Sequence, residues 1–333
     1  MSERNLLRSE TRRLVANGAW PELNTLLLAN ESAARSHPEL VRLLGEGLIR
    51  TGRAREARDW LAEALPRLQH TDDRLSLRMA TVLSGAAYLE LGELDSARRA
   101  FEATLELARY DRDEALVARA MNNLGIVANI EGRWDDAIAL YTLAVTMHQR
   151  NGERRGLAEC SHNMAITYRD RGELAEADDL ERRSTEYARE AEQERLLALA
   201  RLGRAEIALR RRDFALAAKA ANRLSLEFER LDDRIRAADA IRLEGVASTG
   251  LRHFDRARAL LDHALDISRE IGALLNVAET LRARAELCEA TGRMDEALAD
   301  GRAALEAYRT LGATRESEAL AAWMQQLESR DSI

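Results

Sequence analysis

The chain contains few of the residues that characterise disulfide-stabilised, fibrous or membrane-spanning proteins. Its 333 residues include two cysteines, three prolines and 4% aromatic residues. Cys160 and Cys288 lie far apart in the sequence, which argues against a disulfide framework and favours a reducing, cytoplasmic environment. No run of about 18 apolar residues, the length that spans a bilayer, is present. The sequence therefore predicts no membrane-spanning helix.

The charges are nearly balanced, and the basic residues are almost all arginine. With 57 acidic and 50 basic residues the net charge is −7, which argues against non-specific nucleic-acid binding, because that affinity comes from neutralising phosphates. Lys219 is the only lysine. The arginine excess fits either bidentate recognition of carboxylates and phosphates or a GC-rich genome. The segment from Met1 to Trp20 is charged throughout and lacks an apolar centre, so we expect no signal peptide there.

Motifs for catalysis, nucleotide binding and metal binding are lacking. The sequence has no HExxH motif, no GxxxxGK[ST] loop, no GxGxxG loop after a strand and no GxSxG elbow, and these motifs mark the common metal, phosphate and nucleophile sites. The carboxylates are scattered at helical spacing, as on solvated helix faces. We therefore expect no catalytic residue, no cofactor and no metal, and a protein that is not an enzyme.

The strongest pattern is a frame that repeats seven times at equal spacing. One column of the frame is mostly glycine: Gly52, Gly92, Gly132, Gly172, Arg212, Arg252 and Gly292. The column five residues later is all alanine: Ala57, Ala97, Ala137, Ala177, Ala217, Ala257 and Ala297. The column seven residues before the first holds only glycine or alanine: Gly45, Gly85, Gly125, Ala165, Ala205, Gly245 and Ala285. A fixed period of about 40 residues is typical of stacked supersecondary units.

The repeat from Glu114 to Arg150 predicts a helical hairpin. Apolar residues recur at steps of three and four before Gly132 and again after it, which is the spacing of one helix face. Gly132 suits the left-handed position that ends a helix. We expect the two backbones to approach closely where Gly125 and Ala137 lie, so that larger residues there would separate the helices.

These residues resemble the tetratricopeptide repeat family. Its pattern of a large apolar residue, a small one, an aromatic and a later alanine appears as Met164, Ala165 and Tyr168 with Ala177, and as Ser84, Gly85 and Tyr88 with Ala97. The length of the frame is similar to the longer repeat of kinesin light chains, Pins-type adaptors and the regulatory domains of bacterial peptide sensors. The resemblance implies an all-α fold, a right-handed α-α superhelix. Arg204, Glu244, Arg212 and Arg252 depart from the pattern.

The frame predicts a single solenoid over residues 1–333. Residues 1–34 form a degenerate N-terminal hairpin that acts as a cap, beginning at about Glu3 and ending at Asn30. Residues 35–312 hold seven repeats, and residues 313–333 hold a C-terminal capping helix, from Thr314 to Glu328, and a tail. The total is about eight hairpins and the capping helix.

The first helix of each hairpin is expected to line the concave side, where variable columns of the frame mark the binding residues. In the repeat that starts at Glu114, these columns fall next to the core face of the helix at steps of three and four. The predicted partner-binding residues are Arg119, Asn122, Asn123, Ile126, Asn129, His162, Asn163, Ile166, Arg169, Leu199, Leu202, Leu209 and Arg242.

The asparagines are the most specific of these residues. An amide both donates and accepts, so it can hold the backbone of an extended peptide, and the resemblance implies that role for Asn122, Asn123 and Asn163. The alternative is that they tie adjacent helices together. Arg119, Arg169 and Arg242 would pair with acidic groups of the ligand, and the leucines would seat its apolar side chains.

We therefore expect a scaffold that binds a peptide segment or a helix of a partner protein, without nucleic-acid or membrane partners. Two alternatives remain. The chain could be a ligand-responsive sensor acting on a separate effector, since it has no recognisable helix-turn-helix of its own. It could also self-associate through its ends into filaments or rings.

Overall fold

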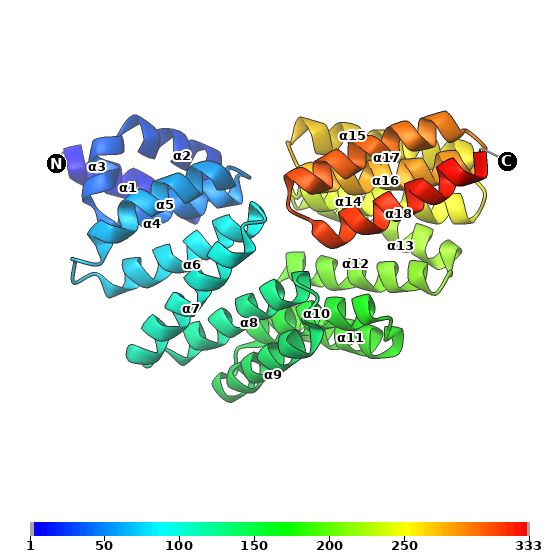
Figure 1. Cartoon of the computed structure of the whole chain (residues 1–333). Helices are drawn as coiled ribbons and strands as arrows, with labels where there is room; N and C mark the ends of the chain where they lie inside the picture. The colour runs from blue at the N-terminus through cyan, green and yellow to red at the C-terminus, as the bar shows by residue number, and fades with distance from the viewer. Residues whose placement is uncertain (1–2, 332–333) are drawn as a thin grey trace. The chain divides into compact units, whose positions relative to one another are not determined.

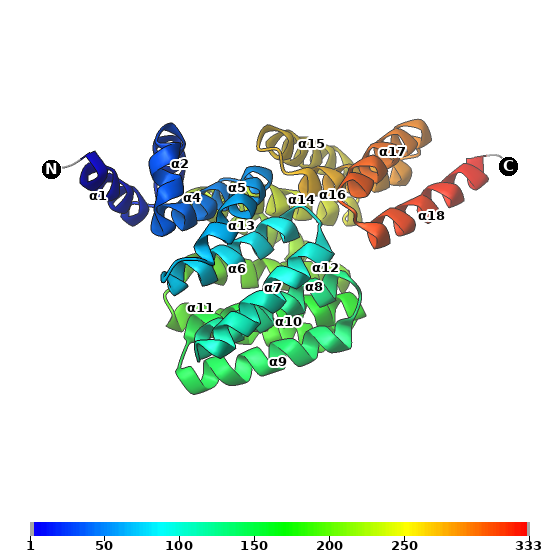
Figure 2. The same cartoon turned by 60° about the vertical axis from the view of Figure 1, so that its left-hand side comes forward.

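The structure, a computed structural model that describes residues 3–331, is built of helices with no strand among those residues. The chain divides into two compact units, Met1–Met147 and His148–Ile333, and the division falls inside α9. Each unit is a series of antiparallel helices in which successive helices pack on each other (Figures 1 and 2).

The first unit contains α1 to α8 and most of α9. Their bounds are α1 Glu3–Ala16, α2 Trp20–Ala29, α3 Glu31–Ser36, α4 Pro38–Arg50, α5 Ala54–Leu68, α6 Arg74–Glu90, α7 Leu94–Tyr110, α8 Glu114–Ile130 and α9 Trp134–Asn151.

The second unit contains the remaining helices. Their bounds are α10 Arg154–Arg171, α11 Leu174–Glu190, α12 Glu194–Arg210, α13 Phe214–Arg230, α14 Arg234–Gly250, α15 Phe254–Glu270, α16 Leu274–Ala290, α17 Met294–Thr310 and α18 Thr314–Asp331.

The turns recur at half the period of the sequence frame. From α6 onward, each turn places one residue at positive φ: Gly92, Arg112, Gly132, Gly152, Gly172, Glu192, Arg212, Asp232, Arg252, Gly272, Gly292 and Gly312. The next N–H closes the turn, as when Arg133 donates to the carbonyl of Ala128 at 2.9 Å, which is the Schellman geometry. Gly132 ends its helix as predicted. The 40-residue frame of the sequence did not predict the turns between hairpins. At three of these turns the residue at positive φ is not glycine but Arg112, Glu192 or Asp232.

The three small-residue columns have different structural roles. All seven residues of the alanine column are fully buried, because a helix lies directly against each of them. The glycines of the third column face a large side chain of the next helix: Leu61, Phe101, Tyr141 and Leu261. A Cβ on Gly125 would lie 2.5 Å from Cε1 of Tyr141. The close partner of Gly125 is therefore the Tyr141 ring rather than Ala137.

A carboxylate takes the place of these large apolar side chains in the second unit. Glu181 occupies the column of Tyr141 one repeat later and is 1% exposed. Gly203 leaves room for it, since a Cβ there would collide with Glu181. Its two oxygens lie 2.9 and 3.0 Å from Nδ1 of His162. Burial raises the pKa of Glu181, and the facing His162 only partly opposes this.

The two repeats that depart from the family pattern keep their geometry. Arg212 and Arg252 adopt φ of 63° and 62°, so they form the same turn that glycine forms elsewhere. Arg204 is exposed and contacts Asp178. Glu244 is buried, and its carboxylate accepts from Arg256 at 2.5 Å. Arg204 and Glu244 are thus both held in ion pairs, Arg204 on the surface and Glu244 in the core.

The ends of the described chain are helical. α1 and α2 are followed by the short helix α3, which the sequence did not predict. Pro21 lies in the first turn of α2, where its missing N–H costs nothing. At the other end α18 packs on α17 and buries Leu320, Met324 and Leu327, while the Nε1–H of Trp323 donates to Glu289 at 3.1 Å.

We expect Arg212→Gly to raise the free energy of unfolding by about 0.5 to 1 kcal/mol. Relief of the left-handed backbone is worth about 1–2 kcal/mol. This exceeds the contact of Arg212 with the ring of Phe214 at 5.9 Å, worth about 0.5 kcal/mol at an exposed site. Urea unfolding measures the change. Arg223→Gly, inside α13 and exposed, is the control and is expected to lose up to about 1 kcal/mol; equal losses for both variants would contradict the argument.

We expect Glu181→Gln to become more stable relative to the unaltered protein as the pH rises. Because the pKa of Glu181 is raised in the folded state from 4.5, its stabilising effect is full below that value and is lost as the pH rises through the folded pKa. Urea unfolding at about pH 4.5 and about pH 7.5 measures the difference. The exposed Glu186→Gln on the same helix is the control. A pH-independent difference for Glu181→Gln would overturn the assignment.

Candidate functional site

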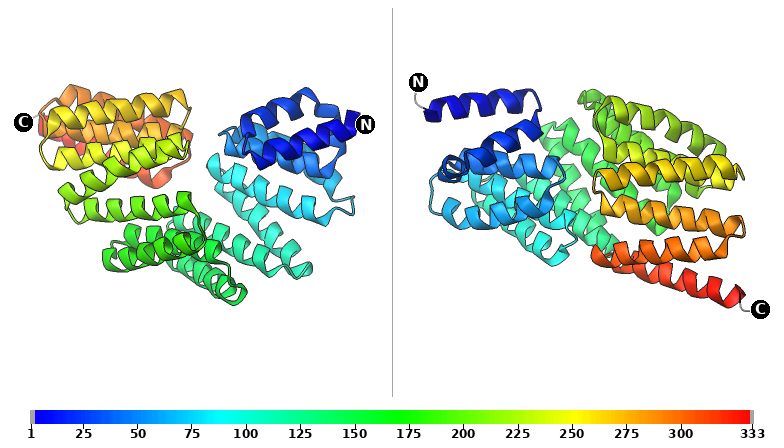
Figure 3. Two further views of the ribbon diagram at one scale, coloured as in Figure 1. Left: turned by 180° about the vertical axis from the view of Figure 1, so that it is seen from behind. Right: turned by 90° about the horizontal axis from the view of Figure 1, so that it is seen from above.

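The first helices of the hairpins in the second unit form a continuous row. In this inner row, α10 contacts α12, α12 contacts α14 and α14 contacts α16, and the ribbons run side by side in two views (Figures 1 and 3). The contact is possible because each helix buries an alanine of the same column: Ala158, Ala198, Ala238 and Ala278. Side chains that do not point into these contacts are left on the face of the row.

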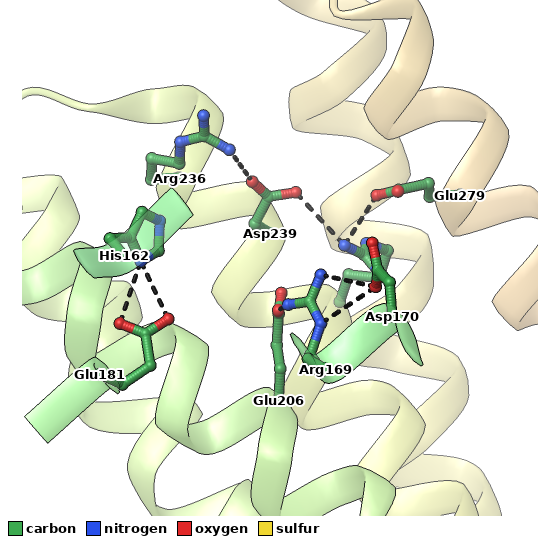
Figure 4. Close-up of polar contacts among 9 residues, drawn as sticks. His162, Arg169, Asp170, Glu181, Glu206, Arg236, Asp239 and Glu279 are labelled. Atoms are coloured by element: carbon green, nitrogen blue, oxygen red, sulfur yellow. Dashed lines mark hydrogen bonds and ion pairs between the residues drawn. The ribbon is translucent and has the colours of Figure 1, made fainter. Parts of the chain in front are cut away.

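Arg169 of α10 links two neighbouring helices at one end of this face. Its Nη1 contacts the carboxylate of Glu206 on α12, and its Nη2 lies 3.4 Å from Oδ1 of Asp170 (Figure 4). All three side chains are half-buried. A charge-assisted contact between successive hairpins fixes the guanidinium in one orientation.

Arg242 of α14 makes an equivalent link to α16. Its Nη2 lies 2.8 Å from Glu279 and 3.4 Å from Asp239. Asp239 also accepts from Arg236 at 2.9 Å and from the amide of Asn276 at 2.8 Å. Burial by itself would lower the pKa of Arg242, but the charges of Glu279 and Asp239 outweigh it and raise the pKa. Arg242 is therefore charged at every physiological pH.

The predicted binding residues of the second unit all lie on helices of this row, and all but one of them are partly exposed. His162, Asn163, Ile166, Arg169, Leu199, Leu209 and Arg242 are partly exposed. Leu202 is 5% exposed and packs in a core cluster with Ala198 and Leu224. The face thus presents apolar side chains together with arginines that the protein's own carboxylates hold in place.

The predicted residues of the first unit all lie on α8. Arg119 is exposed, and it has no ion pair within residues 3–331. Asn123, Ile126 and Asn129 are partly exposed, whereas Asn122 is 6% exposed. Each set therefore occupies a helix face of its own unit.

The described part of the chain has no cluster of metal-ligating side chains and no exposed cysteine. No group of three His, Cys, Asp or Glu side chains in the described chain is placed to hold a metal ion. Both cysteines are buried, and burial raises the pKa of Cys160 to about 12, so its thiol stays protonated and unreactive. Among residues 3–331, no helix is long and apolar enough to cross a membrane.

Sequence reasoning missed the acidic partners of the two arginines. Asp239 and Glu279 stand one and two repeats after Leu199 in a single column of the frame, and Asp170 directly follows Arg169. Equal spacing places Asp239 and Glu279 at the same height on successive helices, where the side chain of Arg242 can reach both. The equal spacing of Asp239 and Glu279 is the sequence signal that identifies these partners.

The comparisons with known proteins concern the repeat and the fold. Residues 116–190 match the tetratricopeptide repeat family. No curated protein matches the chain. A solved structure of a Rap protein complexed with Competence and Sporulation Factor is similar, with a TM-score of 0.66, 13% identity and 98% of each chain covered.

Two further structures share the fold. One is the Rap conjugation gene regulator of plasmid pLS20 in complex with the Phr* peptide, with a TM-score of 0.68, 14% identity and coverage of 84% of this chain and 75% of that one. The other is the apo form of the quorum sensor NprR from B. thuringiensis, with a TM-score of 0.56, 14% identity and coverage of 97% and 98%. Residues 116–190 therefore match the tetratricopeptide repeat, and the all-helical fold of the whole chain is shared with these solved structures.

Proposed function

We propose that this chain is a non-enzymatic interaction scaffold that holds a peptide segment or a helix of a partner protein on the faces of its first helices. The observation that carries the proposal is the inner row of the second unit, where Ile166, Leu199 and Leu209 stay partly exposed among polar groups fixed across successive helices. Fixed polar groups lose little conformational entropy when a ligand arrives.

The contacts that Arg169 and Arg242 already make restrict which groups of a ligand they can bind. Arg169 and Arg242 each contact two carboxylates of the chain. A carboxylate of the ligand would have to compete with these contacts. We therefore assign affinity to the apolar side chains and to the amide of Asn163, and we assign orientation to the charges. Apolar anchors surrounded by polar groups are the usual energetic pattern of an interface.

The fold comparison supports the same proposal. Two of the similar structures are complexes, one with Competence and Sporulation Factor and one with the Phr* peptide. A fold that accommodates ligands in those proteins offers the same type of helical face here. Only 13% and 14% of positions are identical to those two proteins. The residues that would contact a ligand must therefore be identified from this chain's own side chains.

Photo-crosslinking from the inner row tests the proposal. Benzoylphenylalanine replaces Ile166, Leu199 or Leu209 in the full chain expressed in its native host, and the control places it at Leu226, which is 61% exposed on α13. We expect one partner polypeptide to be attached at the three inner positions and not at position 226. Attachment at all four positions alike, or at none of the inner three, would contradict the proposal.

Affinity measurements on single-residue variants use the partner segment that crosslinking identifies. Leu199→Ala or Leu209→Ala is expected to weaken binding about 5- to 150-fold, because an apolar anchor contributes about 1–3 kcal/mol. Asn163→Ala is expected to weaken it about tenfold through a lost hydrogen bond. Calorimetry measures the affinities. Circular dichroism checks the fold, and Leu226→Ala is the control that should bind unchanged.

A regulatory role is the second candidate. It is favoured by the likeness to a conjugation gene regulator and to a quorum sensor over 84% and 97% of this chain. In that case the partner segment would act as a signal and change the conformation of the chain. Small-angle scattering with and without the crosslinked segment distinguishes the candidates, since a passive scaffold is expected to give the same profile in both states.

A further inference from the structure

One face of α9 is exposed to solvent and carries no charge. Four exposed residues at steps of three and four form it: Ala139, Thr142, Leu143 and Thr146. This spacing places them in a single stripe along the helix, which we call the α9 face. Leu143, at its centre, is 52% exposed. Residues 137–149 contain no Asp, Glu, Lys or Arg, and they form the longest such stretch in the sequence.

The other repeats place charge where the α9 face has none. In the same four columns of the frame, each of the six other repeats has at least one charged residue: Glu63, Glu102, Arg183, Arg223, Asp262 and Arg302. Charged residues are usual on the solvent side of an amphipathic helix and are depleted where a surface is covered by a protein partner. The absence of charge in this one repeat therefore indicates that the α9 face is covered by another protein surface.

The two threonines of the α9 face have hydrogen-bond partners within their own helix. Oγ1 of Thr142 donates to the carbonyl of Ile138 at 2.7 Å, and Oγ1 of Thr146 donates to the carbonyl of Thr142 at 2.9 Å. Burial of a hydroxyl is costly chiefly when its donor is left without an acceptor, and these donors keep theirs. An apolar surface can therefore cover the whole α9 face without leaving a threonine donor unpaired.

Charges of opposite sign lie at the two ends of the α9 face. Asp135 and Asp136 are in the first turn of the helix and Arg150 is in the last turn, and all three are exposed. Leu143 is seven residues from Asp136 and seven from Arg150, or about 10 Å along the axis in each direction. Asp136 lies 2.7 Å from Arg133, whereas Arg150 has no ion pair within residues 3–331.

This arrangement of charge selects a second copy of the same helix as the partner. A partner that is acidic along its length would be repelled by the aspartates, and a basic one would be repelled by Arg150. Two α9 helices laid antiparallel are matched at both ends, because Arg150 of each copy then lies opposite Asp135 and Asp136 of the other. The same symmetry places Leu143 against Leu143 of the other copy, and Ala139 against Thr146.

We propose that the α9 face is the interface of a homodimer, in which two α9 helices pack antiparallel about a two-fold axis at Leu143. An isologous contact of this kind uses the same patch on both copies. One helix per copy offers less than the roughly 800 Å² per partner of a standard stable interface. We therefore expect a reversible dimer with a dissociation constant in the micromolar range. The proposal uses none of the residues assigned to partner binding and stands independently of that function.

Sedimentation equilibrium of the full chain tests the proposal. We expect the mass to rise from monomer to dimer as the protein concentration is raised through the micromolar range. Leu143→Arg places two like charges together at the axis and is expected to weaken the dimer at least about tenfold. Leu226→Arg, at a leucine of α13 that is 61% exposed, is the control and should dimerise normally. A monomer at every concentration, or a dimer that Leu143→Arg leaves unchanged, would overturn the proposal.

Reversal of the end charges tests the antiparallel orientation. Arg150→Glu forms one variant, and Asp135→Lys combined with Asp136→Lys forms the other. Each alone is expected to stay monomeric, because like charges then meet at both ends of the interface. An equimolar mixture is expected to regain the dimer, because opposite charges meet again. Dimers of either variant alone as strong as those of the unaltered protein would contradict the orientation. Circular dichroism checks that both variants keep their helices.

Disulfide trapping tests the position of the axis without altering any charge. Leu143→Cys is expected to form a covalent dimer on mild oxidation, because a residue at a two-fold axis meets its own counterpart within the reach of a disulfide. Both native cysteines are buried. Ala303→Cys is the control, since Ala303 is exposed in the same column of the frame on α17. Equal rates of covalent dimerisation at the two positions would rule out an axis at Leu143.

Discussion

The contact that the rest of the structure depends on is the fully buried alanine that recurs once in every repeat. Each of these seven side chains is excluded from water, because the neighbouring helix approaches as closely as a methyl group allows. A larger residue would push the helices apart, since close-packed interiors leave no space to absorb it. Neither helix of a hairpin can bury its apolar stripe alone. The constant spacing of the small residues therefore sets where each helix begins, how it packs and which of its faces remains free.

The architecture could be predicted from the sequence because it depends on local and periodic signals. The helix spacing, the left-handed glycine turn at Gly132 and the all-helical repeat fold were all expected, and the structure agrees. The turns at Arg112, Glu192 and Asp232 could not be identified, because arginine and glutamate do not favour positive φ and a single aspartate favours it only weakly. These turns are imposed by the packing of the helices on either side.

The candidate site was predictable only in part, because exposure depends on neighbours that a column does not reveal. Leu199 and Leu202 are three residues apart on α12, yet the first is partly exposed and the second is in the core. Glu181 shows the same limit. Its column holds Leu61, Phe101, Tyr141 and Leu261 in the hairpins where glycine faces it. Only the structure reveals that Gly203 and His162 make room for a carboxylate there.

The departures from the frame are of two kinds. At Arg212 and Arg252 the fold keeps its geometry, and the altered side chains remain on the surface of the turn. At Glu181 a carboxylate stands in a column of large apolar side chains, and it lies in the core beside His162. The first kind stores a small amount of backbone strain. The second kind buries an ionisable group, and burial raises the pKa of Glu181. In the first kind the backbone adapts to the side chain; in the second the facing helix adapts, because Gly203 leaves the space that Glu181 fills.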